Sequence, residues 1–230
     1  MRVIAFILLA LFTIPITFLK LRVKPTGKTR KMLDFRGLQE IPFDIYIGGI
    51  FLGFMGVYVA PFYVESFALD RHITDTNLAF YLIPILNGAS TFGRILPNYF
   101  ADKVGTLNVI ACFAVISGIL ILCWISISNA AALVAFCALY GFFSGPFVSL
   151  VPVGLISSSK SNAVVGAQLG AGFAIIGIGM LIGTPIGGAV LANSGFLGLQ
   201  LYGGLLTVAC GLIVAVSKIA RYGKNPFTRA

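Results

Sequence analysis

The chain has 230 residues, of which 58% are hydrophobic and only 10% are charged, and its formal net charge is +9. Soluble domains carry about 25% charged residues, so this composition excludes an ordinary soluble fold and indicates an all-α membrane protein in contact with the lipid bilayer. The basic excess does not indicate a nucleic-acid partner, because the basic residues cluster at the ends of apolar segments, as in cytoplasmic loops.

Residues that hold metals or carry out catalysis are scarce. The single histidine, His72, lies in a polar connection, and the four cysteines fall inside apolar runs without a C-x-x-C pair. A metal centre or an intramembrane enzyme would need a cluster of such groups. No glycine pattern completes a nucleotide-binding loop. We therefore expect no metal, no cofactor and no enzymatic activity.

Seven apolar segments are long enough to be candidate membrane spans, which need roughly 20 residues each. The longer ones are expected to tilt or to break near Pro61, Pro84, Pro152 and Pro185. The segments comprise residues 3–19, 43–67, 78–100, 107–127, 130–156, 163–192 and 196–216. The first of them could instead be a secretory signal peptide, but Pro15 interrupts it and no small-x-small cleavage site precedes Lys20, which favours a retained helix.

The connections between these segments alternate in charge. "KLRVKPTGKTRKMLDFR" after the first segment has seven basic residues, and "ADKVGT", "SSSKSN" and the C-terminal "SKIARYGKNPFTR" each contain Lys or Arg, whereas "SISN" and "ANSG" carry no charge. Because basic loops stay in the cytoplasm, the pattern predicts an outer N-terminus and a cytoplasmic C-terminus.

Glycines recur at four-residue spacing, which allows helices in lipid to approach closely. Gly141 and Gly145 form one such pair in the fifth segment, and Gly179 and Gly183 form another in the sixth, just before Pro185. Helix packing is the simpler interpretation. The alternative is that these glycines let helices rock against one another during transport, and the sequence does not separate the two.

The segment "GRILPNYFADKVG" interrupts the apolar pattern with Gly93, Arg94, Asp102, Lys103 and Gly105. It resembles the signature that joins the eighth and ninth helices of major facilitator superfamily transporters, where it forms a cytoplasmic gating turn. "YGFFSGPFVSLVPVGLISS" and "IGTPIGGAVL" resemble the tenth and eleventh helices of the monocarboxylate-transporter branch, in particular its fungal members.

The resemblance implies helices 6–12 of a twelve-helix fold. Residues 1–36 would then be one helix with the central cytoplasmic loop, residues 37–220 the six-helix C-terminal half, and residues 221–230 a basic cytoplasmic tail. Such a half supplies only part of a binding site. The chain would be a truncated transporter, would assemble with a missing N-terminal half or another transporter chain, or would be a non-transporting remnant. We favour the first.

In this family an arginine of the eighth helix pairs with a substrate carboxylate, and Arg94 occupies the matching position. The resemblance therefore predicts a substrate site at Arg94 with Asn87, Ser90, Tyr140 and Phe147. An arginine within a span is costly and by default suggests function. The alternative is that Arg94 reaches toward the cytoplasmic surface or pairs with Asp102. Ser90 stands where well-studied members have an aspartate that couples transport to protons.

The leading prediction is transport of a small organic anion, such as a monocarboxylate, across the plasma membrane. The serine at position 90 favours a different cargo, so efflux of a larger secondary metabolite is the alternative. A membrane interaction or regulatory protein without transport is a third possibility from another class.

Overall fold

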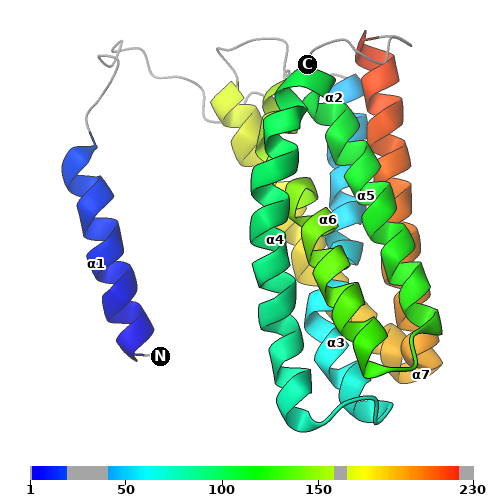
Figure 1. Cartoon of the computed structure of the whole chain (residues 1–230). Coiled ribbons are helices and arrows are strands. Elements are labelled where there is room, and N and C mark those ends of the chain that lie inside the picture. The colour runs from blue at the N-terminus through cyan, green and yellow to red at the C-terminus, as the bar shows by residue number, and fades with distance from the viewer. Residues whose placement is uncertain (1, 20–40, 158–164, 223–230) are drawn as a thin grey trace. The chain divides into compact units, whose positions relative to one another are not determined.

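The computed structural model describes residues 2–19, 41–157 and 165–222, and within them the chain is helical, with no strand. This confirms the all-α class. The chain divides into two units. The first contains α1 (Arg2–Phe18), an apolar helix exposed along its described side chains, and the second contains the remaining helices (Figure 1).

The second unit is a bundle of long helices. Its elements are α2 (Ile41–Val57), α3 (Val59–Asp70), α4 (Thr76–Val104), α5 (Thr106–Cys123), the short 3-10 helix η1 (Trp124–Ser126), α6 (Ala130–Ser157) and α7 (Val165–Tyr222). Among the described residues, four stretches are long and apolar enough to cross a membrane: Ile41–Asp70, Thr106–Ser126, Ala130–Ser157 and Val165–Arg221. The α1 helix is apolar but shorter, and the predicted span at 78–100 falls within the 29-residue α4.

The boundary between the sixth and seventh predicted spans is a kink within α7. Gly195 has φ 67° and ψ −170°, which is not a helical conformation, so α7 is two helices that meet at this residue. A positive φ strains any residue with a side chain, and glycine is therefore suited to this position. The uncharged "ANSG" connection ends at this glycine, as the sequence predicts.

The prolines have unequal effects on their helices. The predicted span 43–67 is interrupted at Tyr58, three residues before Pro61. Proline has no N–H, so Pro61 cannot bond the carbonyl of Val57, and α2 ends there. The buried hydroxyl of Tyr140 donates a hydrogen bond to that carbonyl instead. The helices continue through the other expected break points, Pro84, Pro152 and Pro185.

Glycines lie where the helices cross. α4 runs beside α6, and α7 packs along both α2 and α5 (Figure 1). A Cβ on Gly183 would lie 2.6 Å from the Cα of Met55 in α2, and one on Gly179 would lie 2.9 Å from the carbonyl oxygen of Phe51. A Cβ on Gly141 would collide with the carbonyl oxygen of Leu86 in α4. Only residues without a side chain let these backbones approach so closely.

Candidate functional site

A cavity of about 90 Å³ lies where the α2–α3 break faces α4 and α6. It combines apolar walls with hydroxyl, amide and guanidinium groups, which is the composition expected of a small-molecule site. It is lined by Val57, Tyr58, Pro61, Leu86, Asn87, Ser90, Arg94, Ser144 and Val148. Three of the five predicted substrate-site residues, namely Asn87, Ser90 and Arg94, are among them.

The spacing of these three residues places them on one face of α4. Steps of three and four residues return to the same side of a helix, so Asn87, Ser90 and Arg94 follow one another along the face that meets α6. Ser90 is buried, at 5% exposed, whereas Asn87 and Arg94 have exposed side chains. Arg94 lies ten residues before the end of α4, or roughly 15 Å along the helix axis.

Gly145 of α6 makes room for the arginine. A Cβ at this position would lie 2.7 Å from the carbonyl oxygen of Ser90 and 3.3 Å from Cγ of Arg94. The aliphatic stem of Arg94 therefore packs against the α6 backbone, which leaves its charged end at the cavity. Gly145, expected from the sequence to be a packing residue, thus borders the candidate site.

The guanidinium of Arg94 has donors to offer. It carries five N–H groups and no acceptor, and among the side chains that the structure describes it has no hydrogen bond or ion pair. Tyr58 lies close enough to interact with it electrostatically. The side chains of Asp102 and Lys103 lie outside the described residues, so pairing of Arg94 with Asp102 stays a prediction. Available donors at this depth suit a carboxylate or another planar anion.

Tyr140 and Phe147 lie behind the cavity instead of lining it. Both are fully buried. The hydroxyl of Tyr140 donates a hydrogen bond to the carbonyl of Val57, and the ring of Phe147 packs on that of Phe54 with centroids 5.8 Å apart. They support the wall of the cavity. The lining residues Tyr58, Pro61 and Ser144 were not predicted, although a proline within an apolar span was a signal for Pro61.

The Gly93–Gly105 motif occupies two different environments. A Cβ on Gly93 would collide with the carbonyl oxygen of Phe142 in α6, so this glycine sets the α4–α6 approach. Gly105, at φ 97°, separates α4 from α5. Its N–H donates to the carbonyl of Ala101 at 2.9 Å, and its carbonyl accepts from the N–H of Asn108 at 3.1 Å. The turn therefore bonds to both helices that it joins.

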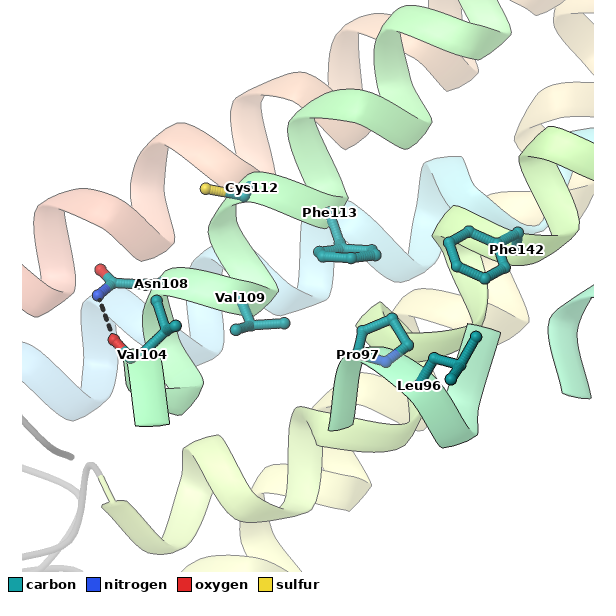
Figure 2. A pocket seen from close by; sticks show the side chains of 8 residues that line it. All are labelled: Leu96, Pro97, Val104, Asn108, Val109, Cys112, Phe113 and Phe142. Atoms are coloured by element: carbon teal, nitrogen blue, oxygen red, sulfur yellow. Dashed lines mark hydrogen bonds between the residues drawn. The ribbon is translucent and has the colours of Figure 1, made fainter. Parts of the chain in front are cut away.

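A larger cavity, about 410 Å³, lies elsewhere, between α4, α5 and α6 (Figure 2). Its lining contains no charged side chain, and its one amide, Asn108, already donates to the carbonyl of Val104 at 2.9 Å. Nothing in it would orient a polar cargo, so we place the candidate site at Arg94 and not here.

No family model matches the sequence. The chain is nevertheless similar over nearly its whole length to fungal transporters. It is 39% identical to the MFS-type transporter dbaD of Emericella nidulans over 219 residues, which cover 94% of this chain and 49% of the relative. It is 32% identical to the agnestins efflux protein AgnL12 of Paecilomyces divaricatus over 95% of this chain, and 29% identical to the aspyridones efflux protein apdF of Emericella nidulans over 96%. The chain is related to the major facilitator superfamily.

The chain spans about half the length of the major facilitator superfamily relatives that it matches. This coverage supports the expectation of a part that resembles the C-terminal half of such a transporter. The relatives are named as transporters or efflux proteins, and members of the superfamily are not enzymes, so the prediction of a non-enzymatic membrane protein is confirmed. The names do not distinguish the monocarboxylate-transporter branch from others.

Proposed function

We propose that this chain forms one half of a secondary transporter that exports an organic anion, with Arg94 as the contact for the anionic group. The proposal rests mainly on the cavity at the α2–α3 break. There the available guanidinium of Arg94 lies with Tyr58, Asn87, Ser90 and Ser144. The hydroxyl and amide groups would orient the cargo, and the arginine would select for negative charge.

The cargo that we propose is an acidic secondary metabolite. Two relatives are named as efflux proteins, one for aspyridones and one for agnestins, which favours export of a fungal metabolite over uptake of a nutrient. The cavity lining supports this choice, because it contains no carboxylate and has Ser90 in place of a proton-carrying aspartate. Monocarboxylate uptake is the second candidate, and the motifs that resemble the monocarboxylate-transporter branch favour it.

The remaining half of the site would come from a second six-helix half. That half would be an N-terminal segment of a longer protein or another transporter chain, and residues 37–220 would be the C-terminal half. The basic connections favour a cytoplasmic C-terminus, most simply at the plasma membrane. The turn at Gly93, Asp102, Lys103 and Gly105 would then be a cytoplasmic gate, and the glycine contacts of α7 would let helices rock.

The proposal can be tested in yeast cells. The chain would be expressed alone and together with the first half of the dbaD relative, and the cells would be loaded with carboxyfluorescein, a fluorescent organic anion. We expect faster loss of the dye than in empty-vector cells, with the effect abolished in Arg94→Gln and partly kept in Arg94→Lys. Flux only with the added half would support the two-half arrangement.

Membrane abundance of each variant, measured by immunoblot, is the control for expression. Equal dye loss from Arg94→Gln and from the original chain at equal abundance would refute the role of Arg94. Arg94-dependent accumulation of labelled pyruvate, without dye loss, would favour the monocarboxylate candidate. No flux of either probe in either setting would contradict transport of organic anions.

A further inference from the structure

A second polar cavity lies at the end of the bundle where α3 and η1 end and the second part of α7 begins. Its volume is about 200 Å³, and it shares no lining residue with the Arg94 cavity. The lining residues are Phe67, Arg71, Ile73, Ile125, Ile127, Ser128, Leu197 and Gln200. They come from three segments that are far apart in sequence, namely the end of α3 with the residues after it, η1 with the residues after it, and the second part of α7, so the fold itself assembles this cavity.

An unsatisfied amide lines the cavity. Gln200 is only 2% exposed, and its Nε2 has no hydrogen-bond partner. The nearby indole Nε1 of Trp124 is also buried without a partner. A buried donor without an acceptor is destabilising and therefore uncommon in native proteins. An acceptor from a bound molecule would satisfy Gln200 at this position.

A positively charged side chain lines the same cavity. Arg71 follows the last residue of α3, and the described residues offer its guanidinium no hydrogen bond or ion pair. Arg71 and Gln200 therefore supply donors to one cavity, and Ser128 adds a hydroxyl. The other walls are apolar, from Phe67, Leu197 and the three isoleucines. A cation would be repelled by Arg71, and a fully apolar molecule would leave both donors unpaired.

We propose that this cavity is a binding site for a small carboxylate with an apolar body, whose anionic oxygens accept hydrogen bonds from Arg71 and Gln200. The volume of about 200 Å³ has room for several water molecules, which a short-chain acid such as butyrate would displace. The site shares no lining residue with the Arg94 cavity, so it would be a second anion site. A lipid phosphate presents the same anionic oxygens and is the other possible source.

The only tryptophan of the chain reports on this site. The ring of Trp124 meets the ring of Phe67, a lining residue, edge to face with centroids 5.0 Å apart. A ligand that contacts Phe67 should therefore change the fluorescence of Trp124. Titration of the purified full-length chain in a nonionic detergent with butyrate, at constant ionic strength, measures binding directly. Butyramide, which has a similar shape without the charge, is the matched ligand control.

We expect a saturable fluorescence change with butyrate and none with butyramide. Arg71→Gln and Gln200→Leu should each raise the dissociation constant by at least ~10-fold, because each removes a donor to a charged acceptor. Arg94→Gln should change it by less than ~2-fold, because a neutral residue there leaves this cavity intact. Gln200→Leu should not lower the melting temperature, since it removes an amide that is unpaired in the ligand-free chain.

The same titration in phosphatidylcholine nanodiscs, with and without phosphatidylglycerol, separates the two sources of anionic oxygen. Competition by phosphatidylglycerol that disappears in Arg71→Gln would identify a lipid headgroup as the occupant of the same site. Any of the following results would overturn the proposal: no saturable response to butyrate, an equal response to butyramide, or affinity that does not change in the folded Arg71→Gln protein. Loss of the response in Arg94→Gln alone would place the binding in the other cavity and would also overturn it.

Discussion

The hydrogen bond from the hydroxyl of Tyr140 to the carbonyl of Val57 should stabilise the fold more with Pro61 present than with a residue that has an N–H at that position. In an uninterrupted helix the N–H of residue 61 would bond that carbonyl, but proline has none. Tyr140 is fully buried and Val57 is 3% exposed, so water does not replace the lost partner. Tyr140→Phe removes only the hydroxyl, because the ring stacks on Phe136 with centroids 5.6 Å apart and can stay there.

The expected loss of stability depends on whether the carbonyl of Val57 has another hydrogen-bond donor. Leaving a buried carbonyl without a partner costs about 1–3 kcal/mol, so Tyr140→Phe should lower the free energy of unfolding by that amount. Pro61→Ala returns an N–H to position 61 and allows α2 and α3 to join. In that background the carbonyl has a second donor, and Tyr140→Phe should then cost less than about half as much.

The assay is a double-mutant cycle on the purified chain in mixed micelles. Unfolding by added dodecyl sulfate, followed by helical circular dichroism, gives a free energy for the original chain, each single variant and the double variant. We expect a coupling energy of at least half of the Tyr140→Phe loss, or roughly 0.5–1.5 kcal/mol, between positions 61 and 140. Equal losses in the two backgrounds, within about 0.5 kcal/mol, would mean that the proline does not free the carbonyl as argued.

Tyr46→Phe is the matched control for this cycle. Tyr46 is also fully buried, and its hydroxyl donates to the carbonyl of Val151 at 3.1 Å. The residue four positions after Val151 is Leu155, which has an N–H of its own. Tyr46→Phe should therefore cost the same with and without Pro61→Ala.

The same unfolding measurement tests two further pairs of variants. Gly93→Ala should lower the free energy of unfolding by about 1–3 kcal/mol because its Cβ meets the carbonyl oxygen of Phe142, whereas Gly88→Ala, with nothing within 4 Å, should raise it by up to ~1 kcal/mol. A loss of stability in Gly88→Ala equal to that in Gly93→Ala would contradict the packing argument. Gly105→Ala should cost about 1–3 kcal/mol because φ is 97° there, and Gly177→Ala, whose Cβ would meet nothing within 4 Å and which lies in regular helix, should not.

The class of fold is predictable because lipid leaves few alternatives. Backbone groups in the bilayer must bond within their own segment, so apolar runs of spanning length predict helices directly. The kink at Gly195 is predictable too, since a short polar connection with glycine separates two such runs. The break at Tyr58 is displaced from the prediction at Pro61 because a proline acts on the carbonyl four residues earlier, where the helix loses its bond.

The site is only partly predictable. Polar residues on α4 stand out against an otherwise apolar surface, so the spacing of Asn87, Ser90 and Arg94 predicts one shared face. α6 is apolar on all sides, and its sequence does not reveal which side meets the cavity. Tyr140 and Phe147 were for that reason expected in the site, and the structure places them behind its wall, while Ser144 lines it.

Two backbone carbonyls near the arginine lack their helical hydrogen bond because of a proline four residues later. Pro146 leaves the carbonyl of Phe142 without its helical partner, and Gly93 is the residue that lies against that oxygen. Pro61 does the same to Val57, where Tyr140 supplies the missing bond. Free carbonyls within a membrane are tolerated only where protein or a cavity surrounds them. The structure meets this condition on both sides of Arg94, so the prolines, Gly93 and Tyr140 form one arrangement that shapes the cavity. A change at any of these positions should therefore alter the cavity even though none of them, apart from Pro61, lines it.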